Sequence, residues 1–208
     1  MMAEISEREQ LIFDVSRREW EMFQNVYNTG GRASCQDDPD TFYRMRMSQW
    51  MVYSDELLKS YQRDCETAVA NGRNLIFEKY ARMMETTYPE EFEKLLTYLP
   101  EISLEKDEKI EEIVKVHLEW DREVAEKYPK VRGNGRTATT KEDSVNSGSS
   151  MESYLRAEIK TYSDETLNFL YRETMNAYKK GDNLLEQIIA NETAFYGYQS
   201  LKDAESKM

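Results

Sequence analysis

Residues 53–75 read YSDELLKSYQRDCETAVANGRNL, and residues 162–184 read YSDETLNFLYRETMNAYKKGDNL. In both stretches a serine stands before two acidic residues. This order is typical of a helix start, because the hydroxyl accepts a first-turn N–H and acidic groups favour the positive end of the helix dipole. Apolar residues at helical spacing follow, and a glycine then ends the helix. The two stretches therefore predict one helical unit that occurs twice.

Three shorter motifs recur around this unit. They are Glu19-Trp20 with Glu119-Trp120, Gly31-Arg32 with Gly135-Arg136, and Asp37-Asp38 with Glu142-Asp143. Their order along the chain is preserved, which favours a tandem duplication over chance. We expect an all-α protein whose two repeats, residues 1–100 and 101–208, pack about a pseudo-two-fold axis into one bundle-like domain.

Helix formers dominate the rest of the chain, which has only four prolines and eight glycines. Helices are expected at residues 4–28, from Pro39, at 54–71, 74–87, 89–100, 103–128, 150–161, 163–180 and 182–198. Residues 29–38 and 129–149 are expected to be loops. The tail after Leu201 is expected to fray, as chain ends often do.

The composition limits the classes of function. The net charge of −12 disfavours binding to phosphate backbones and to anionic lipid headgroups. No apolar run approaches the roughly 20 residues that span a membrane, and the charged N-terminus is not typical of a signal peptide. Cys35 and Cys65 do not make a disulfide framework. We expect a cytoplasmic protein, monomer or homodimer, with neither nucleic acid nor membrane as a partner.

The loop at residues 30–39, GGRASCQDDP, is the least ordinary segment. Arg32 offers a planar fork for a carboxylate or phosphate, and Asp37 and Asp38 suit a cation or an amine. Cys35 would be a nucleophile only if a neighbouring cation or helix N-terminus lowered its pKa. The alternative is a structural turn in which Asp38 caps the next helix and Arg32 pairs with an acid. The sequence leaves both open.

Glu19 lies at helical spacing from the apolar residues Ile12, Val15, Met22 and Phe23. Buried carboxylates are rare unless they are paired. Glu19 is therefore either a ligand, metal or proton-handling group, or the partner of an arginine such as Arg32 or Arg136.

His117 and Asp121 lie on the corresponding apolar stripe of the second half, where a hydrogen-bonded core histidine is the commoner outcome. No Glu-x-x-His pair or other ligand spacing is present, so no metal is assigned and the cofactor stays unknown. Trp20 and Trp120 are either core anchors or aromatic walls beside a ligand.

The leading hypothesis is a protein that binds a small polar or zwitterionic molecule between its repeats, with an enzyme of unknown reaction as an open extension. Mixed arginine and acidic side chains in matching loops motivate it. The expected site consists of Glu19, Trp20, Arg32, Ser34, Cys35, Asp37 and Asp38 from the first half, with Trp120, Arg136, Glu142 and Asp143 from the second. The alternatives are a protein–protein interaction module with structural loops and, more remotely, an acidic nucleic-acid mimic.

Three segments carry a resemblance to a known family. REWEMFQNV-x-N-x-GGRASCQDDP-x-TF spans Arg18 to Phe42, GRNL-x-x-EKYARMME spans Gly72 to Glu85, and YGY-x-SL spans Tyr196 to Leu201. Together with Tyr154-Leu155-Arg156 and Lys160-Thr161-Tyr162-Ser163, they resemble a bacterial family known as domain of unknown function 4125. The resemblance implies a cytosolic helical bacterial protein and transfers no activity. The serine-rich loop from Asn146 to Ser150 departs from the family pattern.

Overall fold

The computed structural model describes residues 5–27, 30–143 and 148–208, and every regular element in these ranges is helical. The α-helices are α1 (Glu7–Gln24), α2 (Pro39–Trp50), α3 (Asp55–Ala70), α4 (Leu75–Thr87), α5 (Pro89–Leu95), α6 (Leu104–Lys127), α7 (Pro129–Gly133), α8 (Met151–Ile159), α9 (Asp164–Lys180), α10 (Leu184–Phe195) and α11 (Leu201–Lys207). Short 3₁₀ turns occur at Ser34–Asp37, Leu96–Tyr98 and Thr140–Glu142. The expected all-α class is confirmed.

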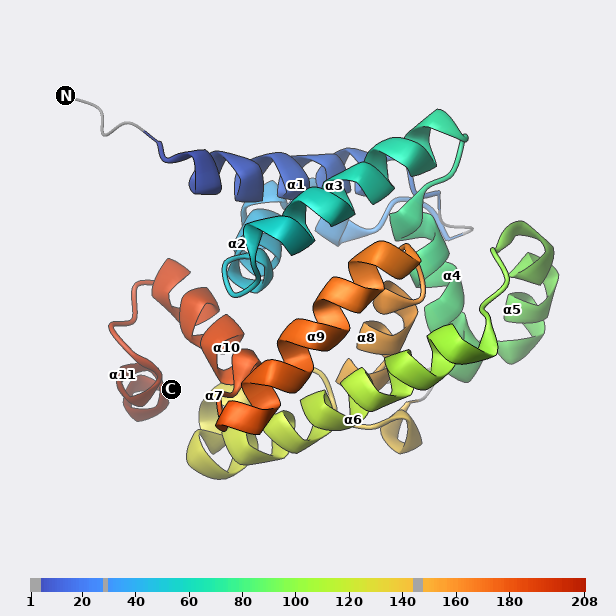
Figure 1. Cartoon of the computed structure of the whole chain (residues 1–208). Coiled ribbons are helices and arrows are strands. Elements are labelled where there is room, and N and C mark those ends of the chain that lie inside the picture. The colour runs from blue at the N-terminus through green and yellow to red at the C-terminus, as the bar shows by residue number, and fades with distance from the viewer. Residues whose placement is uncertain (1–4, 28–29, 144–147) are drawn as a thin grey trace.

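The long helices form two layers that face each other. Helix α1 packs beside α3 at one side of the molecule, and α6 packs beside α9 at the other (Figure 1). Between them α3 contacts α9, while α4 packs on α8 and α10 packs on α2. Helix α4 of the first half therefore packs on the second half, and helix α10 of the second half packs on the first. Helix α5 lies at the edge of the molecule (Figure 1).

The core is shared by the two halves. Its largest fully buried side chains include Trp50, Tyr61, Ile110 and Leu167, which belong to one continuous cluster. Because both halves contribute to the same apolar cluster, residues 1–100 and 101–208 do not have separate cores. None of the described helices is long and apolar enough to cross a membrane.

The caps that the sequence predicts are present. Ser54 accepts the N–H of Leu57 and Ser163 accepts the N–H of Thr166, each at 3.2 Å. Helix α9 ends at Gly181, whose φ of +77° is a left-handed conformation that side chains with a Cβ rarely adopt. The start and the stop of the unit at residues 162–184 are therefore confirmed.

Two expectations at the C-terminal side were wrong. The tail does not fray: α11 forms after Leu201 because Leu201 and Ala204 bury their side chains against Val131. The expected loop after Tyr128 begins with α7, which supplies Val131 and starts at Pro129, a favoured first helical residue. Residues 1–4, 28–29 and 144–147, which include the first two positions of the serine-rich segment, lie outside the described residues.

Candidate functional site

Glu19 is the centre of a buried polar cluster and is 0% exposed. Its partner is Arg46, on α2, and neither Arg32 nor Arg136. The Arg46 guanidinium binds both carboxylate oxygens of Glu19, at 2.8 Å for the Nε–Oε2 bond. Trp50 Nε1 and Tyr61 Oη each donate to the same carboxylate at 3.0 Å. The salt-bridge interpretation of Glu19 is thus confirmed, with a different arginine.

A second carboxylate, Glu158 on α8, extends the cluster across the two halves. Arg46 donates to it at 3.0 and 3.1 Å, and Lys79 Nζ of α4 donates at 3.1 Å. Gln49 and Tyr162 complete its shell at 2.9 and 3.0 Å. Glu19, Arg46, Lys79 and Glu158, called the buried charge cluster below, therefore join α1, α2, α4 and α8.

The buried charge cluster is balanced, with two cations and two carboxylates. Burial by itself would raise the pKa of Glu158, but the charges of Arg46 and Lys79 outweigh it and hold that pKa below its usual range. Burial likewise opposes the charge on Lys79, but Tyr154 and Glu158 keep the pKa of Lys79 above its usual value. Glu158 and Lys79 are therefore both charged at neutral pH.

The first glycine-arginine loop is held largely by its own contacts. Arg32 donates to Asp37 at 2.8 Å and to the Gln36 carbonyl at 2.7 Å. Asp38 accepts the N–H of Thr41 at 3.1 Å, caps α2, and has a lowered pKa because of that bond. The structural interpretation is confirmed for Arg32 and Asp38. Ser34, Cys35 and Asp37 are exposed to solvent.

The second loop presents its arginine differently. Arg136 donates to the Ser149 carbonyl at 3.0 Å, and its guanidinium carbon lies 4.9 Å from the centre of the Tyr154 ring. Asp143 accepts the Ser150 N–H and the Thr86 hydroxyl, both at 2.6 Å. Partial burial would raise the pKa of Asp143, but these bonds lower it. The side chain of Glu142 lies outside the described part of the structure.

Tyr80, on α4, lies close to the first loop, because the Gln36 amide donates to the Phe23 carbonyl at 2.8 Å and the Phe23 ring centre lies 5.8 Å from that of Tyr80. Lys79 Nζ lies 5.5 Å from the centre of the Tyr80 ring and 4.3 Å from that of the Tyr154 ring, over which Arg136 of the second loop lies. Burial raises the pKa of Tyr80. We call Cys35, Tyr80, Arg136 and Tyr154 the loop site.

The two tryptophans have unlike surroundings. Trp20 is half-buried and its ring lies 5.1 Å from that of Phe42, whereas Trp120 is fully buried against the ring of His117 at 4.9 Å. Burial lowers the pKa of His117 to about 4, and its Nε2 has no hydrogen-bond partner among the described residues. Trp120 therefore packs inside the core, whereas Trp20 packs against its edge.

Asp121, the other polar residue of that stripe, is held by Arg132. His117 is buried beside Trp120, whereas Cys35 is exposed. Groups of three or more histidine, cysteine or acidic side chains that could hold a metal ion are absent from the described residues.

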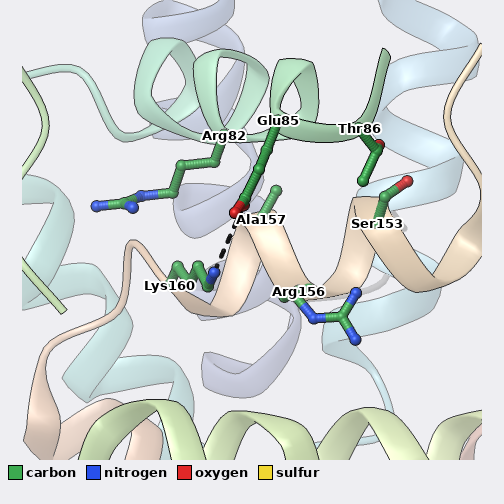
Figure 2. A pocket seen from close by; sticks show the side chains of 7 residues that line it. All are labelled: Arg82, Glu85, Thr86, Ser153, Arg156, Ala157 and Lys160. Carbon is green, nitrogen blue, oxygen red and sulfur yellow. Dashed lines mark ion pairs between the residues drawn. The ribbon is translucent and has the colours of Figure 1, made fainter. Parts of the chain in front are cut away.

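A small cavity between α4 and α8 lies outside the predicted site. Its volume is about 20 Å³, which suits one water molecule and no larger ligand. Figure 2 shows Lys160 reaching toward Glu85, an ion pair of 3.7 Å, while the guanidinium groups of Arg82 and Arg156 point to opposite sides. The cations that line the cavity do not converge on a common centre.

Sequence reasoning missed four residues of the polar centre: Arg46, Lys79, Tyr154 and Glu158. A signal existed for Glu158, whose neighbours Leu155, Ile159 and Tyr162 place it on an apolar stripe as Glu19 is placed. No such signal marks Arg46, because α2 has no clear apolar face.

The fold and these contacts define an all-helical protein with a charge-balanced polar centre beneath two converging loops. Residues 9–206 match the family described as "Protein of unknown function (DUF4125)", and the chain belongs to this family. No curated protein and no solved structure matches the chain.

Proposed function

We propose that the chain arose by tandem duplication and that its halves are related by a pseudo-two-fold axis between α3 and α9. Two reciprocal contacts support the axis. The N–H of Ser54 donates to Glu173 at 3.0 Å, and the N–H of Ser163 donates to Asp64 at 2.9 Å. The first N-cap is thus held by the second half and the second N-cap by the first half. The exchanged packing of α4 on α8 and of α10 on α2 fits the same axis.

The helix contacts also refine which residues correspond. Asn74 donates to the Met22 carbonyl at 2.7 Å, and Asn183 donates to the Trp120 carbonyl at 3.1 Å. Met22, rather than Trp20, is therefore the counterpart of Trp120. With this register Glu19 corresponds to His117, so the two halves place different polar groups at the same buried position. The duplicated scaffold carries an asymmetric polar centre.

We further propose that the protein binds a small polar molecule at the loop site. The observation that carries the proposal is the position of Arg136, from the second loop, over the Tyr154 ring, next to Tyr80, whose ring packs on Phe23 beneath the first loop. Pockets that bind small molecules often form where two structural units meet. Arg136 is exposed and makes no ion pair with a carboxylate of the described residues, so its charge is available to a ligand.

Native mass spectrometry of the protein purified from its own source tests this proposal, followed by thermal-shift measurements with amino acids, carboxylates and phosphates. A co-purifying or stabilising molecule is expected, and Arg136→Ala should abolish its effect. Arg122→Ala is the matched control, because Arg122 is an exposed arginine of α6. The absence of any bound or stabilising molecule, or equal loss in the control, contradicts the assignment.

A protein–protein interaction module is the second candidate. Tyr98 and Leu104, next to α5, are 73% and 76% exposed, and α5 buries none of its residues. Large exposed apolar side chains are typical of interfaces when they are contiguous. A dimeric mass in solution that Tyr98→Ser converts to a monomeric mass supports this candidate, and a monomeric wild-type protein contradicts self-association.

A further inference from the structure

We propose that the loop site recognises the acidic group of its ligand, a carboxylate or a phosphate, through Arg136 and the Tyr154 hydroxyl, with Lys79 as a positioning residue. This inference rests on the proposed function, and it names the chemical class of the ligand. It also narrows the zwitterionic molecule expected from the sequence to one whose acidic end is the recognised end.

The Tyr154 hydroxyl is set up as a donor. Lys79 Nζ donates to the Tyr154 oxygen at 2.8 Å and so occupies one of its acceptor positions. An ammonium group has no lone pair and cannot accept the phenolic hydrogen in return. No acceptor for that hydrogen is found among the described residues. Tyr154 can therefore donate its hydrogen to an incoming oxygen.

Arg136 favours an anion at the loop site. Its guanidinium carbon lies 4.9 Å from the centre of the Tyr154 ring, and it makes no ion pair with a carboxylate of the described residues. Arginine presents paired N–H donors that match the geometry of carboxylate and phosphate oxygens.

A ligand amine would find no free carboxylate in the buried charge cluster. Glu19 accepts from Arg46, Trp50 and Tyr61, and Glu158 accepts from Arg46, Lys79, Gln49 and Tyr162. Both carboxylates are already neutralised and hydrogen-bonded. The cluster thus holds Lys79 in place below Tyr154 without adding an attraction for cations.

Lys79 acts through Tyr154. Its side chain is 3% exposed, and its ammonium lies 4.3 Å from the centre of the Tyr154 ring. A group this deeply buried does not meet a ligand at the surface. Its role is to fix the direction of the Tyr154 hydroxyl and to favour negative charge near it.

The test is calorimetric titration of the full chain with two probes, inorganic phosphate and malonate, and with ethylamine as the cationic comparison. We expect one anion per chain, and no binding of ethylamine. Arg136→Ala and Tyr154→Phe should each weaken anion binding about tenfold or more, since a hydrogen bond to a charged group is lost. Arg122→Ala should leave the affinity unchanged. The stronger of the two probes identifies a phosphate or a carboxylate as the recognised group.

A separate measurement tests the positioning role of Lys79. Lys79→Gln should weaken anion binding and shift the Tyr154 ring-carbon NMR signal, while Lys79→Arg should restore both. If Lys79→Gln does not fold, the Arg136 and Tyr154 variants, which lie outside the buried charge cluster, still decide the ligand class.

Binding of ethylamine in place of the anions, in a manner sensitive to Arg136→Ala, overturns this inference and leaves the proposed function standing. Anion binding that survives both variants overturns this inference and also places the ligand outside the loop site. Failure of the protein to bind any small molecule, in titration and in native mass spectrometry alike, removes the proposed function as well.

Discussion

Replacement of Arg46 by leucine tests the energetic role of the buried charge cluster. The change removes the cation that Glu19 and Glu158 share, at a position that is 4% exposed. Leucine fills much of the volume, so the main effect is the loss of charge pairing. Glu19 keeps only the Trp50 and Tyr61 donors, while Glu158 keeps Lys79, Gln49 and Tyr162.

The expected cost follows from the desolvated carboxylate that remains. Breaking a buried ion pair by removal of one partner costs about 3–5 kcal/mol. At about 2–4 °C per kcal/mol for a chain of this size, the melting temperature should fall by about 6–20 °C. The loss is large against the roughly 5–15 kcal/mol that stabilises most domains. Arg122→Leu, at an exposed position of α6, should change the stability by less than about 0.5 kcal/mol.

The pH dependence distinguishes lost pairing from lost packing. Against burial, which alone would raise the pKa of Glu158, Arg46 contributes most to lowering it, so the stability that this pair contributes is present above the usual glutamate pKa of about 4.5 and is lost as the pH falls below it. The deficit of the variant should therefore be larger at pH 7 than at pH 3.5, measured by urea unfolding at both. A deficit below about 1 kcal/mol, or one of equal size at both pH values, would refute the reasoning.

Three further outcomes are expected. His117 has a folded pKa of about 4 against 6.5 in the unfolded chain, so its contribution to stability, about 3 kcal/mol, is present above pH 6.5 and lost as the pH falls toward 4; an NMR titration midpoint near 6.5 would contradict this. Trp50→Phe removes the 3.0 Å bond to Glu19 and should cost about 1.5–3 kcal/mol in urea unfolding, and a neutral effect would count against the bond. Gly181→Ala should destabilise by about 1 kcal/mol because its φ is +77°, whereas unchanged or higher stability would show that the left-handed turn is not needed.

Local signals in the sequence predict most of the helices. The serine caps at Ser54 and Ser163 and the stop at Gly181 depend on residues within a few positions, so a single stretch of sequence contains their cause. The tail was mispredicted because α11 depends on Val131, about 70 residues earlier in the chain. The sequence pattern around residues 201–207 does not reveal this long-range contact.

The polar centre was likewise predicted only in the part that depends on local sequence. The apolar neighbours of Glu19 predicted its burial and its need for a partner, and both were found. The identity of the partner was missed, because Arg46 lies on α2, a helix without a distinct apolar face, and because the Arg46–Glu158 contact joins α2 to α8. Of the predicted site residues, Arg136 lies over the Tyr154 ring and Cys35 is exposed in the first loop, whereas Glu19 and Trp120 are buried, Trp20 is half-buried and Arg32 is held by Asp37.

Ring-carbon NMR of tyrosine-labelled protein, titrated with inorganic phosphate or malonate, tests the central claim most directly. Tyr80 and Tyr154 lie at the loop site, Tyr61 is buried beside Glu19, and Tyr128 lines a shallow hollow with Lys127 and Lys202 near α11. The proposal predicts saturable shifts of Tyr80 and Tyr154 that disappear in Arg136→Ala, with Tyr128 unaffected. Shifts confined to Tyr128, or no saturable shift of Tyr80 and Tyr154, would contradict a ligand site formed by the two converging loops.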